Sequence, residues 1–146
     1  MDLRSMSVLE ELLLCEWAAV GAYTIALGAC DEGDLKAALR AFEDAHEVLA
    51  HRLEEDVAAQ GGHVPAPPSS LSGVALPTRV EGASRAALLA VFGTERVAER
   101  HYAAAAAEPA LDPSARAFVA EARAAQSRRI AWIAARLAPG AARRAA

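Results

Sequence analysis

Hydrophobic residues recur three or four positions apart through most of the chain, which is the spacing of amphipathic α-helices. In one such segment the apolar stripe follows Leu35, Leu39, Phe42, His46, Leu49, Leu53 and Val57. The pattern predicts four helices, at about 7–29, 34–60, 84–108 and 112–138. The 146 residues are therefore expected to form a single all-α domain.

Local signals indicate where the helices begin and end. Ser7 with Glu10 three residues later is the pattern of a capping box, so the first helix is expected to begin at Ser7. Asp112 before Pro113 is typical of an N-cap followed by the first residue of a helix. The tail at 139–146 is expected to fray, because nothing in it indicates packing.

The connections between the helices predict the topology. Short links join the first helix to the second and the third to the fourth, which predicts two antiparallel hairpins. The middle connection, about 61–83, begins with two glycines and carries four prolines. A loop of that length can cross the whole bundle and set the third helix parallel to the second. The fold class predicted is a four-helix bundle of two hairpins joined by a long crossover.

The first predicted helix carries two apolar stripes, so it is expected to be buried on two faces. One stripe follows Leu12, Glu16, Ala19, Tyr23 and Ala26, and the other follows Leu13, Trp17, Val20, Thr24 and Leu27. We expect the second stripe to form a homodimer interface centred on Trp17. The alternative is that the crossover loop covers this face with Leu71, Val74 and Leu76.

Composition narrows the classes of partner. A net charge of −4 argues against nucleic-acid binding, which requires a basic surface. Residues 12–30 are long and apolar enough to span a membrane, but Glu16 and the many small residues favour a buried helix instead. Cys15 and Cys30 would lie about 22 Å apart on one helix, too far to form a disulfide. Two free thiols and no signal peptide predict a cytoplasmic protein.

Carboxylates on apolar stripes are the main chemical feature, because a charged group is rarely buried without a partner or a metal. Glu16 precedes Tyr23 by seven residues, and Glu95 precedes Tyr102 by the same spacing. A further carboxylate, Glu43, lies three residues before His46, on the same side of a helix. A di-metal carboxylate centre in a bundle needs a glutamate from each of two helices and a Glu-x-x-His pair from each of the other two.

On these residues and the predicted crossover, the sequence resembles the ferritin-like superfamily over about residues 8–138. It is most similar in pattern to small bacterial ferritin-like four-helix-bundle families, some of which lack metal. The resemblance implies that Glu16, Glu43, His46 and Glu95 are metal ligands, with Glu121 as an additional candidate. It also implies two iron ions as cofactor and iron oxidation or oxygen- or peroxide-dependent redox as the chemistry.

The fourth predicted helix departs from the motif. Glu121 is followed three residues later by alanine rather than histidine, and stripe matching pairs His46 with Gln126. Two functions therefore stay open. In one, the bundle is a metal-free interaction or structural module in which Arg123 or Arg129 neutralises the buried carboxylates. In the other, it is a di-metal protein with a reduced ligand set.

Overall fold

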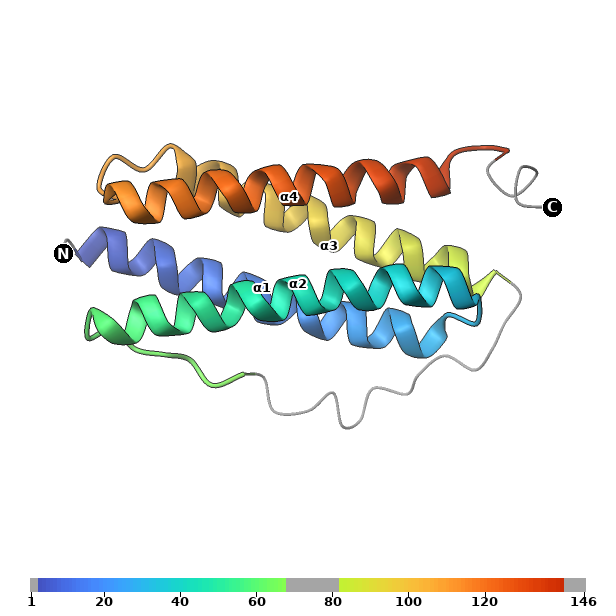
Figure 1. Ribbon diagram of the computed structural model, residues 1–146, viewed down its shortest axis with the longest axis horizontal. Helices are drawn as coiled ribbons and strands as arrows, with labels where there is room; N and C mark the ends of the chain where they lie inside the picture. The colour runs from blue at the N-terminus through green and yellow to red at the C-terminus, as the bar shows by residue number, and fades with distance from the viewer. Residues whose placement is uncertain (1–2, 68–81, 141–146) are drawn as a thin grey trace.

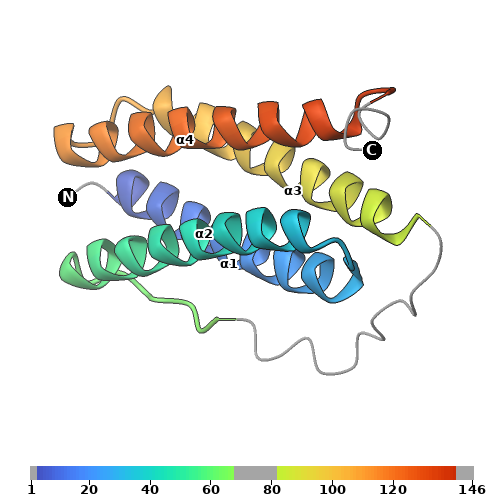
Figure 2. The same cartoon turned by 45° about the vertical axis from the view of Figure 1, so that its right-hand side comes forward.

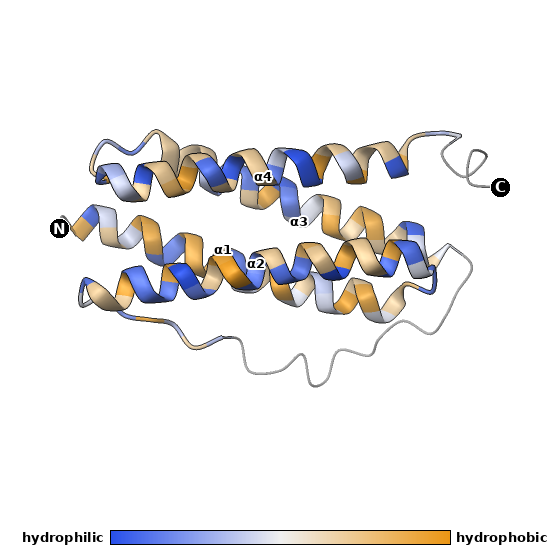
Figure 3. Ribbon diagram, viewed as in Figure 1, coloured by the Kyte–Doolittle hydropathy of each residue, from blue (hydrophilic) through white to orange (hydrophobic). Residues whose placement is uncertain are grey.

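The computed structural model describes residues 3–67 and 82–140, and these form four α-helices and no strand. The helices are α1 (Leu3–Ala29), α2 (Gly33–Ala59), α3 (Ala83–Ala106) and α4 (Pro113–Leu137) (Figure 1). The prediction of an all-α, four-helix chain is confirmed. In Figure 3 apolar and polar residues alternate along each helix, as helices buried on one side require.

The four helices lie side by side along one long axis. In Figures 1 and 2, α1 and α4 begin at the left-hand end, whereas α2 and α3 begin at the right-hand end. The closely packed pairs are α1 with α2, α1 with α3, and α3 with α4. Most of the predicted crossover, residues 68–81, and most of the predicted frayed tail, residues 141–146, lie outside the described residues.

The predicted C-terminal end of α2 and the predicted N-cap of α4 agree with the structure. The predicted start of α1 does not. The Asp112 carboxylate accepts a hydrogen bond from the Ala115 backbone N–H at 2.8 Å, which makes Asp112 the N-cap of α4. Helix α2 ends where Gly61 adopts a positive φ of 75°. The prediction that Ser7 caps α1 is wrong, because α1 already begins at Leu3. Within this additional turn, Arg4 Nε forms an ion pair with Glu108, 2.8 Å long.

The apolar core consists of two separate clusters at opposite ends of the bundle. One contains Leu9, Leu12, Leu13, Trp17, Ala50, Leu53, Val57, Tyr102, Ala105, Leu111, Ala115, Phe118, Val119 and Ala122. The other contains Tyr23, Ala26, Leu27, Ala29, Cys30, Leu35, Leu39, Ala87, Leu88, Val91 and Ile133. Buried polar side chains from all four helices meet between these clusters, so a polar layer crosses the middle of the bundle.

The spacing of residues in α3 predicts an inward stripe of Leu88, Phe92, Glu95, Glu99, Tyr102 and Ala106, and three of these, Leu88, Glu95 and Tyr102, are buried. Phe92, Glu99 and Ala106 were expected to point inward, but they are only half-buried. Their neighbours Val91, Ala98 and Ala105 are buried instead. Half of the buried residues of α3 are small, namely Ser84, Ala87, Ala98 and Ala105.

The surface predicted for a homodimer is largely buried within the subunit. Leu13 and Trp17 are 0% and 8% exposed, and the Trp17 ring packs edge-on against His51 of α2 with centroids 5.5 Å apart. Leu13 and Trp17 are thus packed within the subunit, where α2 contributes to their cover. Residues 71, 74 and 76, which were the alternative cover, lie outside the described residues. The dimer itself stays a prediction.

Among the described residues, one helix is long and apolar enough to cross a membrane. This helix is α1, with a mean hydropathy of 1.6 over its most apolar window. Half of that window is buried inside the bundle. The cytoplasmic location stays a prediction.

The N-cap of α4 provides a direct test of the fold. Replacing Asp112 with alanine removes the acceptor for the Ala115 N–H and is expected to lower the free energy of unfolding by about 0.5–2 kcal/mol. Urea denaturation measures this loss. Asp112→Asn keeps an acceptor oxygen and is expected to remain close to the wild type. Equal losses in both variants would show that the cap is not what stabilises this end.

Candidate functional site

Five polar side chains meet in the layer between the two apolar clusters. They are Glu16 of α1, His46 of α2, Glu95 of α3, and Gln126 and Arg129 of α4, and all are buried. Each helix thus contributes at least one polar group at the same depth of the bundle. A polar group at this depth is out of reach of solvent water, so it needs a hydrogen-bond partner within the protein.

His46 lies between the two glutamates. Its Nδ1 is 2.6 Å from Glu16 Oε2, and its Nε2 is 2.9 Å from Glu95 Oε1. Ionised carboxylates only accept hydrogen bonds, so both ring nitrogens donate and the ring is an imidazolium. Burial alone would lower the pKa of His46, but the hydrogen bonds and charges of Glu16 and Glu95 outweigh it and raise this pKa above 6.5.

The two tyrosines exchange partners between α1 and α3. Tyr23 donates to Glu95 Oε1 at 2.7 Å, and Tyr102 donates to Glu16 Oε1 at 2.6 Å. Because α1 and α3 are antiparallel, an equal seven-residue spacing in both helices aligns each phenol with the glutamate of the other. Burial first, and then the adjacent carboxylates, raise the pKa of both phenols, so they remain protonated donors.

Arg129 supplies the second positive charge of the layer. Its Nε donates to Glu95 Oε1 at 2.8 Å, and Gln126 makes a longer contact of 3.5 Å with Glu95 Oε2. Burial acts to raise the pKa of Glu95, but His46, Arg129 and Tyr23 together lower it from 4.5 to about 2. Glu95 therefore remains ionised and is the most heavily hydrogen-bonded group of the site.

The charges of the layer balance without any added ion. Two carboxylates, Glu16 and Glu95, are matched by the imidazolium of His46 and the guanidinium of Arg129. Buried charges are stable when they are paired and hydrogen-bonded in this way. The arrangement can hold protons at fixed positions and join four helices.

Two of the five predicted ligands lie away from this layer. The half-buried Glu43 accepts a hydrogen bond from the Thr24 hydroxyl of α1. Glu121 is 81% exposed in its side chain and lies 4.0 Å from Arg52. Arg123, one of the two arginines expected to neutralise the carboxylates, is exposed, whereas Arg129 is buried against Glu95. Glu16, His46 and Glu95 are thus the three predicted residues that the fold brings together.

No three His, Cys, Asp or Glu side chains in the described parts of the chain are arranged to hold a metal ion. The geometry of the layer gives the reason. Glu16 and Glu95 bind opposite nitrogens of one imidazole, and a single ring cannot direct both nitrogens to one ion. Arg129 also brings a fixed positive charge onto Glu95, the carboxylate that a cation would need. This arrangement does not fit the di-metal centre that the family resemblance implies.

The Gln126-x-x-Arg129 pair was missed as a unit in the sequence. These residues are three apart, as Glu43 and His46 are in α2, and both contact Glu95. The signal that could have found them is a glutamine and an arginine at the same spacing on the buried side of α4. A similar signal, the repeated seven-residue spacing, could have predicted the tyrosine exchange once α1 and α3 were taken as antiparallel.

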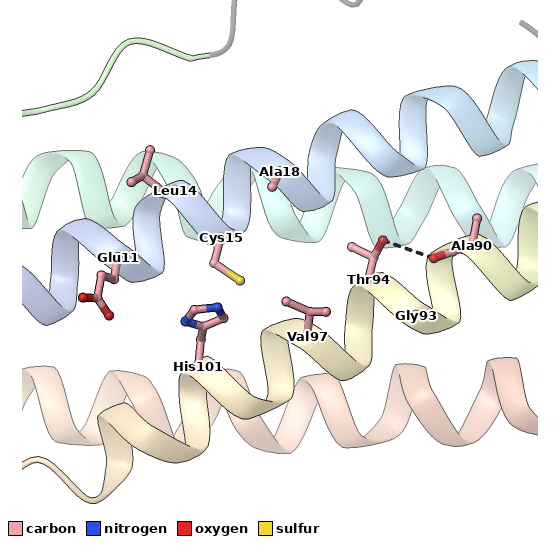
Figure 4. A pocket seen from close by; sticks show the side chains of 9 residues that line it. All are labelled: Glu11, Leu14, Cys15, Ala18, Ala90, Gly93, Thr94, Val97 and His101. Carbon is pink, nitrogen blue, oxygen red and sulfur yellow. Dashed lines mark hydrogen bonds between the residues drawn. The ribbon is translucent and has the colours of Figure 1, made fainter. Parts of the chain in front are cut away.

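A groove of about 710 Å³ lies between α1 and α3, and none of the five polar residues of the layer lines it (Figure 4). Cys15 and His101 extend into it from opposite walls, which could suggest a thiol nucleophile. Burial, followed by the charges of Glu16 and Glu95, raises the Cys15 pKa from 9.0 to about 12. The thiol therefore stays protonated at neutral pH and is a poor nucleophile.

No protein-family model, curated protein or solved structure shows a significant match to this chain. The function must therefore be inferred from the geometry of the site.

The pH dependence of stability tests the charge assignment. The pKa of Glu95 is lowered, so its stabilising effect is present above pH 4.5 and is lost as the pH falls toward about 2. The pKa of His46 is raised, so its effect is complete below pH 6.5 and is lost as the pH rises through its folded value. We expect the free energy of unfolding, measured with urea, to be highest at about pH 5–6.

The alkaline side of this stability profile tests the charge of His46 directly. The free energy of unfolding should be compared only below pH 9.0, because above that value the raised pKa of Cys15 also destabilises the folded state. In His46→Gln the loss between pH 6.5 and 9.0 should be much reduced. An unchanged slope in this variant would contradict the presence of an imidazolium between the glutamates.

Proposed function

We propose that this protein is a metal-free bundle of the ferritin-like type that acts as a structural or interaction module. The observation that carries the proposal is the ion pair of Arg129 with Glu95, next to the His46 imidazolium. These two cations give the carboxylates the positive charge that metal ions give them in a di-metal protein. The layer then stabilises the bundle without a cofactor.

Two features support the ferritin-like classification. Helices α2 and α3 begin at the same end of the bundle, so their connection has to return along its length (Figure 1). The four helices also contribute polar groups in a pattern close to the motif: one glutamate from α1, one from α3, His46 from α2, and a pair three residues apart on α4. In α4 that pair is Gln126 and Arg129 where the motif has glutamate and histidine.

A di-metal protein remains the second candidate, because three of the proposed ligands do meet. Glu16, His46 and Glu95 would hold iron only after Arg129 left Glu95 and the imidazolium gave up one of its two N–H protons. The chemistry would then be iron oxidation or reaction with oxygen or peroxide. Metal analysis of protein purified without chelator, followed by Fe(II) titration in air, separates the two candidates.

The metal-free proposal predicts no stoichiometric metal and no iron oxidation above the rate in buffer. It also predicts that substitutions in α4 can introduce metal binding. The double variant Gln126→Glu with Arg129→His rebuilds the second Glu-x-x-His pair, and it should bind Co(II) with visible absorption bands that the wild type lacks. Near-stoichiometric metal in the wild type would contradict the proposal and support the di-metal candidate.

Removing Glu95 provides a test based on stability alone. Glu95→Ala leaves His46 and Arg129 buried without their shared carboxylate, so we expect a loss of about 3–5 kcal/mol in the free energy of unfolding. Glu99→Ala is the matched control, since Glu99 lies on the same helix and pairs with Arg96 at the surface. That control should cost less than about 1 kcal/mol. Similar losses in the two variants would show that Glu95 has no special role.

A further inference from the structure

A second groove, of about 400 Å³, lies between α2 and α4. These helices are joined by long side chains: Phe42 packs on Trp132 with centroids 5.3 Å apart, and Arg52 lies over the Phe118 ring at 4.7 Å. Small residues leave the space open between these contacts. The groove is lined by Ala41, Asp44, Ala45, Val48, Leu49 and Arg52 of α2 and by Phe118, Glu121, Ala122, Ala125 and Arg129 of α4.

Arg129 connects this groove with the buried layer. It lines the groove and is only 5% exposed, and its Nε donates to Glu95. Its Nη2 is buried and has no hydrogen-bond partner among the described residues. A guanidinium presents five N–H donors in a rigid fork that fits carboxylates, so Arg129 has donors beyond the one that Glu95 uses. An anionic group that reached the floor of the groove would meet an arginine with unfilled capacity.

The walls of the groove are suited to an apolar body. Ala45, Leu49 and Phe118 offer aliphatic and aromatic surface, and Val48 is 68% exposed. Arg52 adds a second positive charge along the wall. The two carboxylates at the groove, Asp44 and Glu121, are exposed to solvent, and Glu121 lies near Arg52. These two carboxylates would repel a small, highly charged anion more strongly than a singly charged anion with an apolar chain.

We propose that the groove between α2 and α4 binds an aliphatic monocarboxylate of medium chain length. The carboxylate points toward the Arg129 guanidinium, and the chain lies against Val48, Leu49 and Phe118. The volume falls within the range of small-molecule sites. The proposal requires Arg129 to be charged, and it is tested by binding alone, separately from the metal content that decides the proposed function.

The test is calorimetric titration of the full chain with octanoate. Wild-type protein is expected to bind one octanoate saturably, and octanol, which has the same chain without the charge, should bind roughly tenfold more weakly or worse. Ala125→Leu adds bulk to the wall of the groove while Arg129 and Glu95 are both retained, and it should weaken octanoate binding by a similar factor. Arg52→Gln, a change at an exposed residue, should weaken octanoate binding more than octanol binding.

Ala124→Leu is the matched control, because Ala124 is exposed on the same helix and does not line the groove. It should bind octanoate like the wild type. Circular dichroism and urea unfolding first establish that each variant is folded. The proposal is overturned by any of three results: no saturable octanoate binding, equal binding of octanol and octanoate, or equal effects of Ala124→Leu and Ala125→Leu.

Discussion

The structure depends on one constraint, which is that the charges buried at mid-bundle must cancel. Glu16 and Glu95 lie in a part of the fold with almost no access to water, where an unpaired carboxylate would be too costly to keep. His46 bridges them as an imidazolium, and Arg129 completes the balance. Because the four groups come from four different helices, the complete set of ion pairs forms only when all four helices are in place.

The same layer defines how the helices align. The Tyr23 ring belongs to one apolar cluster and the Tyr102 ring to the other, while both hydroxyls enter the layer between them. A shift of α1 against α3 by one turn would separate both phenols from their carboxylates at once. The apolar clusters provide most of the burial, whereas the layer makes one alignment of α1 and α3 better than its neighbours.

Helix α4 is where this bundle differs from a metal centre. Arginine at position 129 brings a fixed charge that pairs with Glu95 from within, and the same residue forms part of the wall of the groove next to α2. Arg129 thus neutralises buried negative charge and is also the residue through which a ligand in the groove would contact the layer. This double position connects the proposed structural role with the proposed binding site.

The sequence by itself determined the four helices, because apolar spacing follows directly from the helical repeat, and it determined the α4 cap, because capping is local. It also identified Glu16, His46 and Glu95 as inward-facing, since each lies on an apolar stripe. The tertiary structure decided which neighbours they meet. Residues three apart on a helix differ by about 60° in direction, which is enough to turn Glu43 to Thr24 while His46 points to the centre. Arg129 rather than Arg123 pairs with Glu95 because helix packing turns Arg129 inward and leaves Arg123 on the exposed side of α4.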